Sequence, residues 1–148
     1  MNKIFDVPEP IRSFKGRHSF LSNFYPAVVT WEGRVWPTVE HAYQATKTED
    51  ENEREWVDAC ETAGQAKRMG RKLTIRDGWD EMKVDVMRDL LQLKFQAEPV
   101  RSWLLDTGTA QLIEDNSWGD TFWGVCRGKG ENHLGRLLME VRQGLRAR

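Results

Sequence analysis

Three polar residues recur at helical spacing early in the chain: Glu40, Gln44 and Lys47. Thr38 is a suitable N-cap, so we predict a helix over residues 39–47 that places all three on one stripe. A carboxylate in the first turn of a helix is favoured in its ionised form by the helix dipole. By itself such a stripe is typical of a solvated helix face. The aromatic residues that surround it in the sequence favour a ligand pocket instead.

A second carboxylate, Asp120, lies in a long loop that is rich in glycine and aromatic residues. Two carboxylates suit glycosidic hydrolysis, because an oxocarbenium-like transition state needs nearby negative charge and a base that orients water. The leaving base needs a stacking surface, which an aromatic ring provides at about 1–3 kcal/mol per base. Trp79 and Trp123 are the candidates, although Trp79 suits the protein core equally well. Glu40 and Asp120 are therefore candidate catalytic residues for cleavage of a ribose–base bond.

The composition is that of one globular domain: 148 residues, 39 % of them hydrophobic and 30 % charged, with a net charge of −1. No global basic field attracts nucleic acid or a membrane surface. Cys60 and Cys126 lie far apart and the N-terminus carries no apolar export segment, so we expect a cytoplasmic protein. The histidines and cysteines lack metal-ligand spacing, and no phosphate-binding or dinucleotide motif is present, so we expect neither metal nor cofactor.

The pattern of apolar residues, caps and breakers predicts an α+β fold, a mostly helical single domain over residues 1–148 with one small early β-sheet. The sheet is a β-hairpin over residues 27–36, with Gly33 in its turn. Thr62 and Gln65 have the spacing of a capping box. We expect helices at 39–47, 53–61, 62–72, 79–98, 101–107 and 133–145, a strand at 110–114, and short strands and loops over 1–26.

Two segments are candidates for binding an anionic group. The helix over residues 62–72 is strongly basic, which is typical of a solvated face but leaves Lys67 as a candidate contact to an anionic substrate. Its basic residues are Lys67, Arg68, Arg71 and Lys72. The glycines that precede the last helix bring backbone N–H groups toward its N-terminus, where Asn132 is the expected N-cap. This arrangement is a second candidate anion site.

Five separated motifs form a set: Phe-Leu-Ser-Asn-Phe-Tyr-Pro at 20–26, Pro-Thr-Val-Glu-His-Ala-Tyr-Gln-Ala at 37–45, Asp-Thr-Phe-Trp-Gly at 120–124, Asn-His-Leu-Gly at 132–135, and Leu-Met-Glu-Val-Arg at 138–142. Together they resemble the YbiA/NADAR family, from about residue 12 to the C-terminus. The resemblance implies an N-glycosidase: one branch hydrolyses phosphorylated riboflavin-pathway intermediates, and other members remove ADP-ribose from guanine bases. The implied partner is a small phosphorylated ribosyl molecule, with nucleic acid only in the second case.

The resemblance also implies roles for individual residues. Glu40, Asp120 and Trp123 match motif positions that line the family's pocket and are implicated in catalysis, and Trp79 matches the tryptophan that opens its long helix. With Lys67, which comes from the basic helix and not from a motif, the candidate substrate-binding residues are Asn23, Phe24, Tyr25, Gln44, Lys47, Lys67, Gly124, Gly128, Gly130 and Asn132. Cys126 departs from the family, in which glycine is common at this place, and its side chain could narrow the anion loop.

Three functions follow as alternatives. A metal-free N-glycoside hydrolase uses Glu40 and Asp120 to orient water and stabilise positive charge, while Lys47 and the loop at residues 128–132 hold phosphate. A binding module recognises ADP-ribose or NAD with the same residues and leaves it intact. An interaction domain places every tryptophan in the core and has no pocket lined by Glu40 and Asp120 together.

Overall fold

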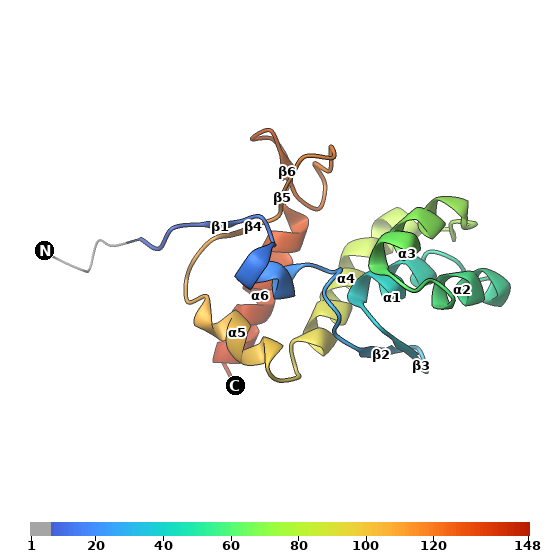
Figure 1. Cartoon of the computed structure of the whole chain (residues 1–148), viewed down its shortest axis with the longest axis horizontal. Helices are drawn as coiled ribbons and strands as arrows, with labels where there is room; N and C mark the ends of the chain where they lie inside the picture. The colour runs from blue at the N-terminus through green and yellow to red at the C-terminus, as the bar shows by residue number, and fades with distance from the viewer. Residues whose placement is uncertain (1–6) are drawn as a thin grey trace, which may run out of the picture.

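Helix α4 (Trp79–Lys94) runs through the middle of the molecule and separates two groups of elements (Figure 1). The computed structural model describes residues 7–148. On one side lie α1 (Val39–Thr46), α2 (Glu51–Asp58), α3 (Ala63–Met69) and the hairpin of β2 (Val29–Trp31) and β3 (Arg34–Trp36). On the other side lie α5 (Val100–Asp106), α6 (His133–Arg146) and a 3₁₀ helix (Gly16–Leu21). The predicted α+β fold with mostly helical content is confirmed.

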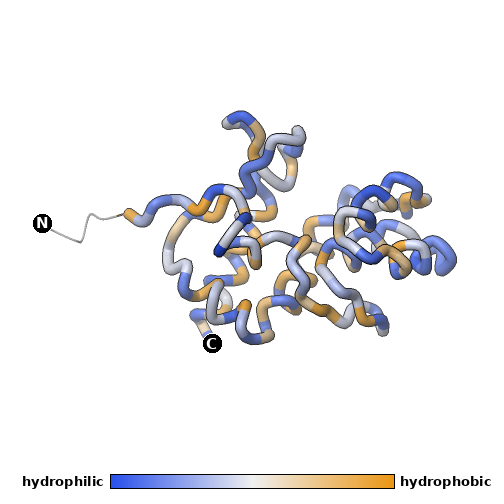
Figure 2. Tube along the Cα trace, viewed as in Figure 1, coloured by the Kyte–Doolittle hydropathy of each residue, from blue (hydrophilic) through white to orange (hydrophobic). Residues whose placement is uncertain are grey.

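The core forms where α4 packs against α1 and α6. Val39 of α1, Leu90 and Leu91 of α4 and Leu138 of α6 are completely buried. Each such side chain contributes about 1.5–3 kcal/mol relative to its exposed state. Figure 2 shows apolar positions recurring along these helices among polar ones, as helices with one buried face require. Within residues 7–148, no helix is both long and apolar enough to cross a bilayer.

The helix starts follow local capping chemistry. The Thr38 hydroxyl accepts from the backbone N–H of His41, and Thr62 with Gln65 forms the predicted capping box. Helix α2 begins earlier than predicted because the Asp50 carboxylate accepts from the next turn's backbone N–H groups, and it ends at Asp58. The predicted bounds of 53–61 were therefore wrong at both ends. Helices α3 and α4 also stop before the predicted residues 72 and 98, the first continuing as a 3₁₀ turn (Gly70–Lys72).

Among residues 7–148, the strands form three separate two-stranded pairs rather than one early sheet. The hairpin is as predicted, and its turn is made by Glu32 and Gly33, both with positive φ. The other two pairs are parallel: β1 (Ile11–Arg12) with β4 (Leu112–Ile113), and β5 (Asp115–Asn116) with β6 (Val125–Cys126). The strand expected at 110–114 is thus only two residues long. The expectation for residues 1–6 lies outside the described residues, and the 3₁₀ helix replaces part of the predicted loops.

Asn132 closes the segment that carries β5 and β6. Its Oδ1 accepts from the backbone N–H of Glu114 at 2.9 Å, and its Nδ2 donates to the carbonyl oxygen of Leu112 at 2.9 Å. Asn132 precedes α6 but has a left-handed backbone, and its side chain makes no capping hydrogen bond to that helix. The predicted capping role was therefore wrong, and the amide instead holds β4 beside the start of α6.

Candidate active site

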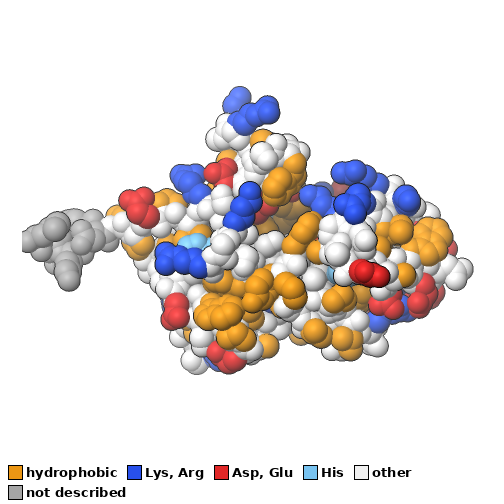
Figure 3. All heavy atoms as spheres, in the orientation of Figure 1, with side chains coloured by type: hydrophobic (Ala, Val, Ile, Leu, Met, Phe, Trp, Pro, Cys, Tyr) orange, Lys and Arg blue, Asp and Glu red, His pale blue; other side chains and the backbone are white. Residues whose placement is uncertain are grey.

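A cavity of about 730 Å³ lies between α1 and α3 on one side and the segment carrying β5 on the other. Glu40 and Asp120 both line it, as do Lys47 and Trp123. Figure 3 shows the hollow beside the projecting β5–β6 segment, with Lys and Arg side chains at its rim. A pocket lined by both acids contradicts the reading as an interaction domain, which required none.

Glu40 is buried in the cavity wall, with 7 % of its surface exposed. Gln44, which is also buried, donates from Nε2 to Glu40 Oε1 at 2.7 Å, and the Glu40 backbone N–H donates to the Asn23 carbonyl at 3.1 Å. The stripe of polar residues on α1 is therefore not a solvated face. Burial raises the pKa of the Glu40 carboxyl, against the opposing effects of Gln44, Lys67 and Lys47. The first-turn position was expected to favour the ionised form, but desolvation is the largest effect on this carboxyl and favours the neutral form.

Asp120 is anchored by its own loop. Its Oδ1 accepts from the backbone N–H of Phe122 at 3.1 Å and of Trp123 at 2.9 Å, and its backbone N–H donates to Asn116 Oδ1 at 3.1 Å. These bonds turn the chain so that the Trp123 ring meets Tyr43 of α1 edge-on at 5.6 Å. The loop thereby brings an indole and a carboxylate to the same wall of the cavity.

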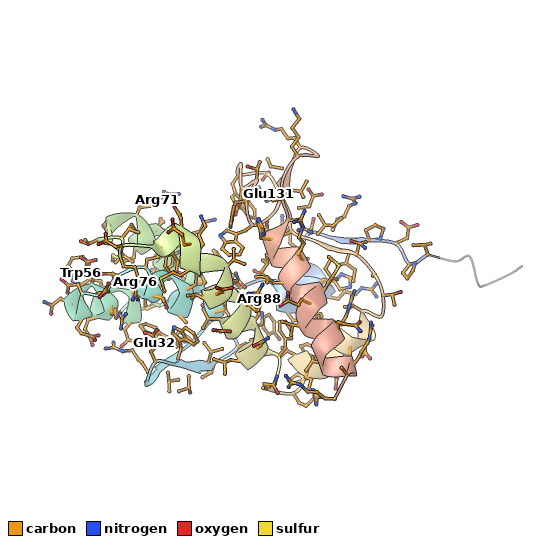
Figure 4. The ribbon with its side chains drawn as sticks, turned by 180° about the vertical axis from the view of Figure 1, so that it is seen from behind. Glu32, Trp56, Arg71, Arg76, Arg88 and Glu131 are labelled. Carbon is orange, nitrogen blue, oxygen red and sulfur yellow. The ribbon has the colours of Figure 1, made fainter. Side chains whose placement is uncertain are left out.

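Basic side chains line the wall opposite Asp120. They are Lys15, Lys47, Lys67, Arg68 and Arg71. Lys67, Arg68 and Arg71 show that the basic helix faces the cavity over part of its length, whereas Lys72 does not line it. Burial lowers the pKa of Lys47, although Glu40 opposes that shift. Seen from behind, Arg71 lies on the α3 side and Glu131 on the β5–β6 side (Figure 4). The β5 side of the cavity therefore forms an acidic wall with Glu114, Asp115 and Asp120, and the α3 side forms a basic wall, while Glu40 lies on α1 with Lys47 at the end of the same helix.

A buried lysine of α4 supports the segment that lines the cavity mouth. Lys94 is 2 % exposed, and its Nζ donates to the Ser22 carbonyl oxygen at 2.9 Å. Burial lowers the pKa of Lys94 to about 7. Next to Ser22, Asn23 and Phe24 line the cavity, as predicted for substrate contacts, and Asn23 Oδ1 is a buried acceptor without a partner among residues 7–148.

Some predicted site residues lie elsewhere. Trp79 does not line the cavity: it is buried and packs against Tyr43 with ring centroids 5.2 Å apart. Trp79 therefore packs against a lining residue instead of lining the cavity itself, and the expected stacking of a base on its face was wrong. Tyr25 lines a different hollow, which it shares with Trp103 on α5. Both aromatic residues therefore belong to the surroundings of the site.

The glycine loop is folded on itself rather than open to an anion. The backbone N–H groups of Lys129, Glu131 and Asn132 donate to carbonyl oxygens of residues 121–126. Gly130 lies so close to the carbonyl of Gly124 that it has no space for a Cβ, Gly124 is packed in the same way against Glu114, and Gly128 forms the turn after β6. Gly124, Gly128, Gly130 and Asn132 do not line the cavity. The loop therefore shapes the acidic wall, and the expected phosphate cradle is not formed.

Several lining residues were not predicted as site residues, among them Tyr43, Glu114, Asp115 and Trp118. Two of them could have been found from the sequence, because Glu114 is a carboxylate at the end of the predicted strand and Trp118 is an aromatic residue in the same loop as Asp120. Trp118 is 55 % exposed, and its ring lies 5.0 Å from Lys67 Nζ, which is also 5.9 Å from the Phe24 ring. The fold and the cavity together define a small α+β protein with a ligand pocket that is lined by both acidic and basic side chains.

Residues 12–146 match the model of the NADAR domain, and the chain belongs to the NADAR domain family. It is 41 % identical over 128 residues to N-glycosidase YbiA of Escherichia coli (strain K12), covering 84 % of this chain and 79 % of that protein. It is 44 % identical over 132 residues to riboflavin biosynthesis protein VVA0006 of Vibrio vulnificus (strain YJ016), covering 86 % of this chain but only 36 % of that longer protein.

The NMR structure of the E. coli protein YbiA superposes with a TM-score of 0.82 at 37 % identity, covering 98 % of this chain and 90 % of that one. The shared fold confirms the expected family architecture. The N-glycosidase relatives, which include one from Nostoc punctiforme at 39 % identity, confirm the expectation of an enzyme of the N-glycosidase class.

Proposed function

We propose that this chain hydrolyses the N-glycosidic bond between a phosphorylated ribose and a nitrogenous base, with phosphorylated riboflavin-pathway intermediates as the first substrates to test. The observation that carries the proposal is one cavity that is lined by Glu40, by Asp120 and by five basic side chains. A ribosyl phosphate needs negative charge near the sugar and positive charge at the phosphate. The name of the E. coli relative supports cleavage of an N-glycosidic bond, and the name of the Vibrio relative supports a link to riboflavin biosynthesis.

In this proposal Glu40 orients the attacking water and accepts its proton. Gln44 holds the carboxylate at 2.7 Å, and burial raises its pKa. A general base is most effective when its pKa lies near the working pH, so the buried position suits this role. Asp120 stabilises the positive charge that develops on the ribose, using the oxygen that its backbone contacts leave free.

The basic wall binds the phosphate. Lys67, Arg68 and Arg71 come from one helix and the turn that follows it, so they present several donors to one side of the ligand. The leaving base stacks on Trp123 in the acidic wall or on Trp118 at the mouth, both of which line the cavity. A ligand held in this way has its glycosidic bond between the two walls.

The experiment compares wild type with Glu40→Gln, using a phosphoribosylated aminopyrimidine and an ADP-ribosylated guanine nucleotide as substrates and mass spectrometry of the products. A positioned base contributes about 10²–10⁴-fold in rate, so we expect ribose phosphate release from the first substrate to fall by at least that lower factor. Glu131→Gln, an exposed site on the β5–β6 side, is the matched control. Turnover of Glu40→Gln above about a tenth of wild type would reject the role.

Removal of ADP-ribose from guanine is a second candidate. The cavity volume of about 730 Å³ and its five basic side chains favour a ligand larger than one phosphate monoester requires. Product release from only the guanine nucleotide in the same assay supports this candidate. Tight binding of ADP-ribose by calorimetry, with no product from either substrate, supports a binding module instead.

A further inference from the structure

Glu114 follows β4 directly and lines the same cavity as Glu40 and Asp120. Its Oε2 accepts from Asn116 Nδ2 at 3.1 Å, whereas its Oε1 has no hydrogen-bond partner among residues 7–148. Gly124 packs so closely against Oε2 that a Cβ at that position would overlap it. One carboxyl oxygen is therefore held in place, and the other is free to meet a ligand.

The charges that face Glu114 come from three elements. Asp115 of β5 and Asp120 of the following loop oppose its ionisation, and Lys67 of α3 favours it. Burial is the largest effect, and together these influences raise the pKa of Glu114 to about 7. A carboxyl group with such a pKa keeps its proton in a large fraction of molecules at neutral pH.

We propose that Glu114 is the general acid of the N-glycosidase reaction and donates a proton from Oε1 to the departing nitrogen base. The inference rests on the proposed function, because it assigns the third group which that reaction requires. It adds a catalytic residue that lies outside the motifs by which the chain resembles its family.

The proton balance of the reaction requires one carboxyl group to act as base and another to act as acid. The water oxygen forms a bond to C1′ of the ribose while Glu40 takes the water proton. The bond between C1′ and the base nitrogen breaks, its electron pair stays on the base, and the Glu114 proton neutralises that base. Ribose phosphate leaves with a C1′ hydroxyl, and one proton passes through solvent from Glu40 to Glu114 to restore the starting state.

The hydrogen bonds around each acid support this division. Glu40 accepts from the Gln44 amide, and Asp120 accepts from two backbone N–H groups, so both serve as acceptors. Glu114 accepts only from Asn116 and has two carboxylate neighbours. Burial raises the pKa of both Glu40 and Glu114. The largest charge effects on Glu40 come from Lys67 and Lys47, which favour its ionised form. The largest charge effect on Glu114 comes from Asp120, which favours the protonated form, so Glu114 is the better placed of the two to hold the proton. Cleavage of the glycosidic bond needs one group that accepts a proton and one that donates a proton, and different surroundings allow two carboxyl groups to take these two roles.

The test measures kcat/KM against pH for wild type, Glu114→Gln and Glu114→Asp, on whichever N-riboside phosphate the wild type hydrolyses. We expect Glu114→Gln to lose about 10²–10⁴-fold in rate near pH 6 and to lose the alkaline limb of the profile. Glu114→Asp retains an acid, so we expect partial activity with that limb present. Glu131→Gln should behave as wild type. Circular dichroism and thermal melting verify that the variants fold.

The outcomes separate this proposal from the proposed function. A wild type that releases no base overturns the proposed function, and carboxyl ¹³C NMR then still tests Glu114, whose titration we expect near pH 7. An active wild type with an equally active Glu114→Gln overturns the assignment of Glu114 alone. The assignment is also overturned if the variant is slow but keeps the alkaline limb, since another group is then the acid.

Discussion

The amide Nε2 of Gln44 donates a hydrogen bond to Oε1 of Glu40 at 2.7 Å inside the wall of the cavity. The other end of the same amide, Oε1, occupies the space that a Cβ would take at Gly70, where α3 ends. The position of the Glu40 carboxylate thus depends on a close approach between two helices. This approach requires a residue without a side chain at position 70.

We expect Gly70→Ala to reduce kcat by about 10–100-fold, because the added methyl group displaces the Gln44 amide and a misplacement of about 1 Å is enough for such a loss. The measurement is steady-state kinetics together with thermal melting. Gly144→Ala is the control, since nothing lies within 4 Å of a Cβ there. It should keep full activity and gain about 0.5–1 kcal/mol in helix stability. An unchanged kcat in Gly70→Ala would show that the amide does not position Glu40.

Two substitutions at Asp120 separate its charge from its structural hydrogen bonds. Asp120→Asn keeps an oxygen that accepts from Phe122 and Trp123, so we expect an unchanged melting temperature and a kcat lowered by about 100-fold. Asp120→Ala leaves those N–H groups without acceptors and should also lose about 1–3 kcal/mol of unfolding free energy. Urea denaturation and product assays on both variants give the comparison. Full activity in Asp120→Asn contradicts an electrostatic role.

Trp118 at the cavity mouth should contribute to binding rather than to the chemical step. We expect Trp118→Ala to raise KM by about tenfold, the value for loss of one stacked base, and to change kcat little. The control is Trp56→Ala, because Trp56 is also exposed, at 46 %, but lies on α2 outside this cavity (Figure 4). Equal KM values for the two variants contradict stacking on Trp118.

We expect the buried Lys94 to make the free energy of unfolding depend on pH. Its pKa of about 7 in the folded protein is below the ordinary 10.5, so between these values the unfolded chain holds a proton that the folded chain has released. Stability should therefore rise with pH across this window. Lys94→Met removes this dependence and should flatten the curve relative to wild type. Urea unfolding at pH 7 and at pH 10 measures it, and parallel curves contradict the assignment.

Local chemistry explains which elements could be predicted. Thr38 and Thr62 begin helices at the predicted residues because a hydroxyl that accepts from the next turn is a property of adjacent residues. Asp50 is an N-cap of the same kind, but residues 48–52 were predicted to be a polar connection, so the predicted start of α2 was too late. The glycine turn of the early hairpin was equally readable, since positive φ is a local requirement.

The missed features depend on contacts between distant segments. The parallel pairs of β1 with β4 and of β5 with β6 involve two residues per strand, too few to leave a sequence pattern. Trp79 fits the helical period of a core residue and of a pocket residue equally, and only packing against Tyr43 distinguishes them. The environment of Glu114 arises from Gly124 and Asp120, which reach it only after the loop has folded.

Asn132 bonds to Leu112 and to Glu114, so the segment of residues 115–131 leaves and re-enters the fold at a single side chain. Because its two ends lie side by side, we expect that residues 115–131 can be replaced by the matching segment of a homologue without disturbing the rest of the fold. We expect transplantation of the segment to alter which ligand the cavity accepts, while Glu40 on α1 and the basic side chains of α3 stay in their places.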